Sequence, residues 1–207
     1  MLEKYTSPEE TLTEIRHLME RSSRFISLSG LSGVLAGVYA LVGALAAYYH
    51  LYMSPQRSAV DYSPRAESSL PFLFADAAIV LIFAVGTGIF LTTRKAKKDG
   101  SSLFDAAAKR LIINLCIPLL AGGIFCIVLT SRGDWHYVAP TMLMFYGLAL
   151  INASKYTRND VRSLGIAELL LGMLCLTVLQ YGLFFWALGF GVLHIAYGTY
   201  MYLKYEK

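Results

Sequence analysis

The chain has 207 residues, of which 56% are apolar and only 15% are charged, and its mean hydropathy is +0.53. Soluble domains are far less apolar, so the composition argues against a soluble domain and favours an integral membrane protein. The net charge of +4 does not indicate nucleic-acid binding, because the basic residues lie at the ends of apolar segments.

Residues 1–24 precede the first apolar segment and predict an amphipathic helix. Ser7 and Glu10 form a capping box, Pro8 suits the first helical position, and apolar residues recur at helical spacing over 12–19. We expect this lead helix to lie in the cytoplasm, against the inner membrane surface or under the bundle; a docking site for a soluble partner is the alternative. The apolar run that follows is too long for a cleaved signal peptide.

Residues 25–207 contain apolar segments long enough to cross about 30 Å of hydrocarbon as helices. The sequence therefore predicts an all-α, polytopic membrane protein with a six-helix transmembrane bundle, since unalternating runs of this length exclude barrel strands. The predicted spans are 25–52, 71–93, 111–130, 137–154, 163–184 and 187–203. The last two come from one continuous apolar stretch, in which Trp186, Gly189 and Gly191 suggest a tight reversal.

The distribution of basic residues predicts the orientation. With a cytoplasmic N-terminus, all but three of the 18 Lys and Arg residues lie on the cytoplasmic side; the exceptions are Arg57, Arg65 and Arg132. By the positive-inside rule, both termini are expected in the cytoplasm. We therefore predict a protein of the plasma (cytoplasmic) membrane, whose basic residues contact anionic lipids at the cytoplasmic face.

The first span carries a surface of small residues that includes Gly30, Gly33, Gly37 and Gly43. Helices in lipid associate by close packing, and small side chains allow two backbones to approach. Gly33 and Gly37 form a GxxxG pair. Packing against another span of the same bundle is the favoured interpretation, and a homodimer contact or another membrane partner is the alternative.

Five polar residues inside the predicted spans are candidates for an intramembrane polar or proton-relay site: Asp76, Asn114, Glu168, Gln180 and His194. Their distances from the span ends place Glu168 and Asn114 in an inner polar layer, and Asp76, Gln180 and His194 in an outer one. Such residues usually face the protein interior and find partners there. Each carboxyl group either holds helices together or exchanges protons or cations, and His194 is the most natural proton relay.

No catalytic motif occurs in the sequence, so no catalytic residue is assigned and enzymatic activity is not expected. An intramembrane enzyme built from scattered residues such as Asp76 and His194 is a minor alternative. The histidines lack paired spacing, so no metal, haem or other cofactor is predicted. The cysteines lie inside predicted spans and are interpreted as small apolar residues.

Two functions fit these features. The first is a non-enzymatic membrane protein, a regulatory or assembly subunit whose lead helix or glycine surface contacts a partner. The second is a small secondary transporter or proton-coupled carrier that uses Asp76, Glu168 and His194. A carrier requires a polar pathway that joins the inner and outer layers, whereas a subunit does not.

Overall fold

The structure, a computed structural model, describes residue 12 and residues 29–53, 65–98 and 106–207. The rest of the predicted lead helix lies outside the described residues. Within the described ranges the chain forms helices and no strand.

The α-helices are α2 (Gly30–Tyr48), α3 (Arg65–Lys98), α4 (Ala106–Ser131), α5 (Val138–Ala153), α6 (Asp160–Thr177), α7 (Gly182–Trp186) and α8 (His194–Tyr205). Two π-helical segments, η1 (Tyr49–Met53) and η5 (Ala187–Leu193), follow α2 and join α7 to α8. Short 3-10 helices lie between other elements: η2 (Trp135–Tyr137), η3 (Ser154–Tyr156) and η4 (Leu179–Tyr181).

Five segments are long and apolar enough to cross a membrane: Gly30–Met53, Ser69–Lys98, Ala106–Ser131, Trp135–Tyr156 and Leu179–Tyr205. Each contains or overlaps one of the predicted spans. The remaining predicted span corresponds to α6, which is 18 residues long and carries the charged residues Asp160, Arg162 and Glu168. Large apolar side chains cover the outside of the bundle, such as Ile82 and Leu120, which are 68% and 66% exposed. An apolar exterior of this extent is expected of a membrane protein.

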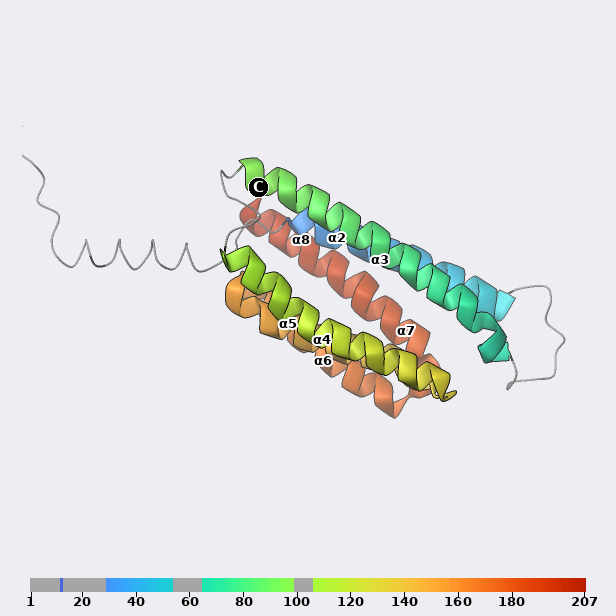
Figure 1. The fold of residues 1–207 in the computed structure, drawn as a ribbon. Coiled ribbons are helices and arrows are strands. Elements are labelled where there is room, and N and C mark those ends of the chain that lie inside the picture. Colours follow the sequence, from blue (N-terminus) through green and yellow to red (C-terminus); the bar gives the residue numbers. More distant parts are fainter. Residues whose placement is uncertain (1–11, 13–28, 54–64, 99–105) are drawn as a thin grey trace, which may run out of the picture.

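The helices form two groups of three (Figure 1). In the first, α2 packs between α3 and the long helical segment formed by α7, η5 and α8; in the second, α5 packs between α4 and α6. The α7–η5–α8 segment also contacts α5 and α6 and so joins the two groups. The outermost helices, α3 and α4, each have one main neighbour.

Glycines bring α2 and α8 together as antiparallel neighbours. A Cβ atom on Gly37 would lie 2.6 Å from the carbonyl oxygen of Gly191, and one on Gly30 would lie 2.7 Å from that of Gly198. Gly33 also faces Gly198. Both glycines of the GxxxG pair therefore lie at a helix contact within the chain, where small residues allow close backbone approach.

The reversal between the last two long helical segments differs from the prediction. The chain turns at Val178 (φ −142°, ψ 58°) and η4, whereas residues 182–205 continue as helix through Trp186. The glycines that suggested a turn are buried in helix contacts instead: Gly189 lies against Glu168, and Gly191 lies against Leu41. The fifth and sixth segments are therefore 160–177 and 179–205. The first half of the predicted hairpin is shorter than expected.

One end of the bundle is held by polar contacts of the C-terminal residues. The Glu206 carboxylate accepts hydrogen bonds from the Gly30 backbone N–H (2.5 Å) and the Ser29 hydroxyl (3.5 Å), and it pairs with Lys95 at 3.0 Å. These contacts tie the start of α2 to the ends of α3 and α8. An acid at the first turn of a helix satisfies backbone N–H groups that have no partner within the helix.

Candidate functional site

A buried carboxyl group, an imidazole and a phenol meet where the two helix groups join. Glu168 of α6 is 0% exposed, and its carboxyl group lies beside Gly189 of η5. A Cβ atom on Gly189 would lie 2.5 Å from Glu168 Oε2 and 2.5 Å from Leu143 Cδ2. The missing side chain of Gly189 therefore makes the space that the carboxyl group occupies.

His194, the first residue of α8, contacts this carboxyl group from the neighbouring helix. Its Nδ1 atom lies 3.4 Å from Glu168 Oε1 and 3.0 Å from the carbonyl oxygen of Gly189, and its Nε2 atom lies 2.7 Å from the Tyr146 hydroxyl of α5. The π-helical segment η5 immediately precedes His194. Such segments are rare and often lie at functional sites. Side chains of α5, α6 and α8 thus form one polar cluster, the Glu168–His194–Tyr146 cluster.

The hydrogen-bond partners define which groups carry protons. The Gly189 carbonyl oxygen can only accept, so Nδ1 of His194 carries a hydrogen. In a neutral ring Nε2 then accepts a hydrogen bond from the Tyr146 hydroxyl. Within the described ranges, neither oxygen of Glu168 has a hydrogen-bond partner. An ionised Glu168 beside a neutral His194 would be a buried, uncompensated charge that costs several kcal/mol. The pair is therefore net neutral, either as a protonated acid beside a neutral ring or as an ion pair.

Aromatic and apolar side chains surround the cluster. Phe190 lies 5.1 Å from the Tyr146 ring and 5.9 Å from the His194 ring, measured between centroids. Tyr146 and Tyr197 pack against the buried apolar residues Leu150, Val161 and Leu164. The Tyr197 hydroxyl is also buried and has no hydrogen-bond partner among the residues that the structure describes. The cluster is thus a small group of polar side chains enclosed by apolar ones, and electrostatic interactions are strong in such an environment.

The candidate polar residues do not lie in the two predicted layers. His194 was expected in the outer layer, with Asp76 and Gln180, yet it contacts Glu168, which was expected in the inner one. Asp76 lies between α3 and α2, where a Cβ atom on Gly43 would lie 3.1 Å from its carboxyl group. Gln180 is exposed in the turn before α7. The layers were inferred from depth along each span, but contacts depend on how each helix is rotated.

Asn114 serves a different contact. The Asn114 side-chain amide donates to the Arg110 backbone carbonyl oxygen at 2.8 Å. The Asn114 backbone carbonyl oxygen accepts from the Asn152 side-chain amide at 2.9 Å. Lys155 donates to Asn152 at 3.2 Å. These bonds hold α4 against α5, near the end of the bundle where α4 begins.

Sequence reasoning singled out Glu168 and His194 but missed Tyr146 and the role of Gly189. Tyrosines in membrane proteins are common at the membrane surface, where they act as anchors. Tyr146 lies near the middle of the predicted span 137–154, however, which is too deep for such an anchor. That depth was the signal for a buried polar partner.

Among the described residues, no group of three or more His, Cys, Asp or Glu side chains could hold a metal ion. The comparisons with known proteins found no matching family, no matching curated protein and no matching solved structure.

Proposed function

We propose that this chain is a non-enzymatic multi-pass membrane protein that acts as a regulatory or assembly subunit through contacts with a membrane partner. It spans the plasma membrane six times with both termini in the cytoplasm. The end of the bundle where α3 ends and α4 begins then faces the cytoplasm, because it carries the basic residues Arg94, Lys95, Lys109 and Arg110.

The partner contact that the structure favours is on α4. The glycine surface of α2 is already occupied by η5, α8 and α3, so it is no longer the best candidate for a partner. Helix α4 packs mainly on α5 and leaves a row of apolar side chains exposed. This α4 face consists of Ile113, Ile117, Leu120, Ile124 and Ile127.

The single observation that carries this proposal is the regular spacing of the apolar residues on the α4 face, next to a glycine with empty space beside it. The five residues alternate at spacings of four and three, which is the repeat that keeps one helix face against a partner helix in left-handed packing. Gly123, next to Ile124, has no atom within 4 Å of a Cβ position. Small residues are enriched where membrane helices pack closely. A facing helix could therefore approach α4 there.

The chain contains its own probe for this contact. Cys116 is exposed on α4, whereas Cys126 and Cys175 are buried. Cysteine-directed cross-linking in native membranes is expected to give one discrete adduct, either with a second copy or with another membrane protein. The variant Cys116→Ser should abolish this adduct.

The substitution Gly123→Leu should reduce the adduct severalfold, because it fills the open position on the α4 face. The matched control is Gly88→Leu on α3, where a Cβ atom also meets nothing within 4 Å. If no discrete adduct forms, or if both substitutions change it equally, the subunit proposal fails.

The second candidate function is a proton-coupled carrier, and the Glu168–His194 pair is the observation that favours it. The pair is buried, net neutral and able to exchange one proton. The third predicted residue, Asp76, lies at the α2–α3 contact and not beside this pair. In liposomes with an imposed pH gradient, Glu168→Gln should abolish proton-linked uptake while the protein stays folded. If Glu168→Gln changes only the stability of the protein and leaves proton-linked uptake unchanged, the carrier function is excluded.

A further inference from the structure

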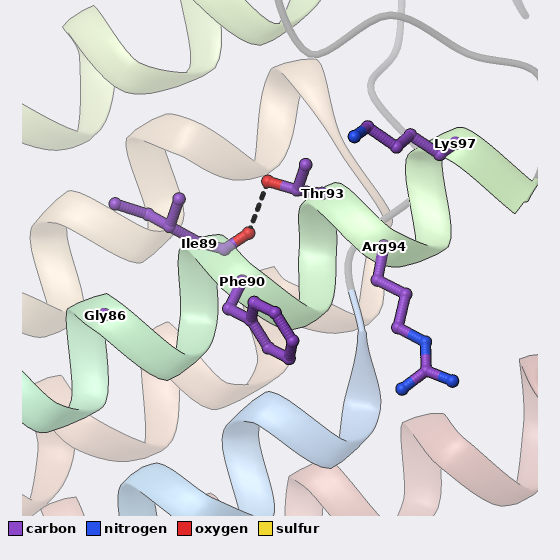
Figure 2. A pocket seen from close by; sticks show the side chains of 6 residues that line it. All are labelled: Gly86, Ile89, Phe90, Thr93, Arg94 and Lys97. Carbon is purple, nitrogen blue, oxygen red and sulfur yellow. Dashed lines mark hydrogen bonds between the residues drawn. The ribbon is translucent and has the colours of Figure 1, made fainter.

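One face of α3 forms a groove whose two ends differ in character. Six residues line a cavity of about 500 Å³, here called the α3 groove: Gly86, Ile89, Phe90, Thr93, Arg94 and Lys97. Figure 2 shows Gly86 at one end of this face and the side chains of Arg94 and Lys97 at the other. The groove is thus apolar along most of its length and cationic at one end.

The apolar part has no free hydrogen-bond donor. The Thr93 hydroxyl donates to the Ile89 carbonyl oxygen at 2.6 Å, as the dashed line in Figure 2 marks. Ile89 and Phe90 are 63% and 64% exposed, and a Cβ atom on Gly86 would meet nothing within 4 Å. This surface therefore suits a hydrocarbon chain and offers little to a polar molecule.

A membrane-spanning α3 would bring the cationic end of the groove to the level of the lipid headgroups. Arg94 directly follows the uncharged part of α3, and both Arg94 and Lys97 are exposed. Neither forms an ion pair with an acid among the described residues, whereas Lys95 of the same helix pairs with Glu206. In Figure 2 the two side chains point to different sides of α3, but both are long and exposed, so they can turn toward one phosphate from positions about 4.5 Å apart along the helix axis.

The length of the groove matches half of a bilayer. Gly86 and Lys97 are eleven positions apart, which corresponds to about 16.5 Å of helix. Half of the hydrocarbon thickness is about 15 Å. One acyl chain can therefore extend from the headgroup level to the middle of the membrane along this face.

We propose that the α3 groove binds one anionic phospholipid of the cytoplasmic leaflet. An acyl chain lies over Gly86 between Ile89 and Phe90, and the phosphate group lies between Arg94 and Lys97. This site is on α3, whereas the proposed partner contact is on α4, so either can be wrong without the other.

The test uses the full chain in phosphatidylcholine nanodiscs doped with a phosphatidylglycerol that carries a photoreactive acyl chain. We expect the photo-adducts to concentrate in residues 86–97 and to exceed those from photoreactive phosphatidylcholine. The double variant R94Q/K97Q should weaken binding roughly 30-fold, equivalent to about 2 kcal/mol for two cations near the membrane surface. The reference is K109Q/R110Q on α4, which removes the same charge at the same end of the bundle.

A second pair of variants tests the groove without changing any charge. Gly86→Leu fills the apolar part and should reduce the adducts severalfold, whereas Gly88→Leu, also in open space but outside the groove, should not. Both variants should elute as the wild type does in detergent. Equal labelling by the two lipids, or equal losses in R94Q/K97Q and K109Q/R110Q, would overturn the proposal. So would equal losses in the two glycine variants.

Discussion

Replacing His194 with phenylalanine tests whether the Glu168–His194–Tyr146 cluster holds the two helix groups together. The ring remains, but three polar contacts are lost: the 2.7 Å contact with Tyr146, the 3.0 Å contact with Gly189 and the 3.4 Å contact with Glu168. Each neutral hydrogen bond contributes about 1 kcal/mol. The loss of the basic neighbour of a buried acid adds at least as much. We therefore expect His194→Phe to lower the free energy of unfolding by about 3 kcal/mol.

The same substitution in a Glu168→Gln background isolates the contribution of the pair. Glutamine cannot ionise, so removing the imidazole should then cost about 2 kcal/mol, for the contacts with Tyr146 and Gly189 alone. Glu168→Gln alone should cost about 1 kcal/mol, because the Glu168 oxygens accept no hydrogen bond from any described residue. The double variant should therefore be about 1 kcal/mol more stable than the sum of the single effects predicts.

The free energy of unfolding can be measured by titrating the protein from mild detergent into dodecyl sulfate while helix content is followed by circular dichroism. Tyr197→Phe is the control, because the Tyr197 hydroxyl bonds to no other group in the described part of the chain and its loss should cost little. If the two effects add within about 0.5 kcal/mol, Glu168 and His194 do not interact energetically and the reasoning is refuted.

Three further predictions concern helix packing and the end of the bundle where α8 ends. Gly37→Leu should destabilise the protein by about 2 kcal/mol or more in the same titration, because even its Cβ atom would lie 2.6 Å from the Gly191 carbonyl oxygen; Gly88→Leu should be nearly neutral. Glu206→Gln should cost about 1 kcal/mol, since it removes the charge that binds the Gly30 N–H and Lys95; no loss would mean that this contact does not hold the bundle end. Burial raises the pKa of the Asp160 carboxyl, but hydrogen bonds from Tyr205 and Lys204 outweigh this and leave its pKa below the usual value. The contact of Asp160 with Tyr205 and Lys204 therefore stabilises the fold fully above the ordinary pKa of an aspartate. This stabilisation, at most about 1 kcal/mol, is lost as the pH falls through the lowered pKa of Asp160. The free energy of unfolding of Asp160→Asn, measured against pH, should lack that step.

Part of the candidate site was predictable because of where its residues occur. A carboxyl group and an imidazole inside long apolar segments are costly unless they find partners, so Glu168 and His194 could be singled out individually. Their pairing could not be predicted, because depth along a span does not show which way a side chain faces. Tyr146 was missed because a tyrosine in a membrane protein is usually interpreted as a surface anchor.

The sequence by itself determined the helical class, the positions of the apolar segments and the expected orientation. Hydrocarbon requires each spanning segment to satisfy its own backbone hydrogen bonds, and this requirement acts on local composition alone. The tertiary structure decided what the glycines do: Gly191 brings η5 against α2, and Gly189 makes space for Glu168, so the reversal occurs at Val178 instead. Local sequence cannot distinguish a glycine that turns the chain from one that admits a neighbour, because the difference lies in atoms from another helix.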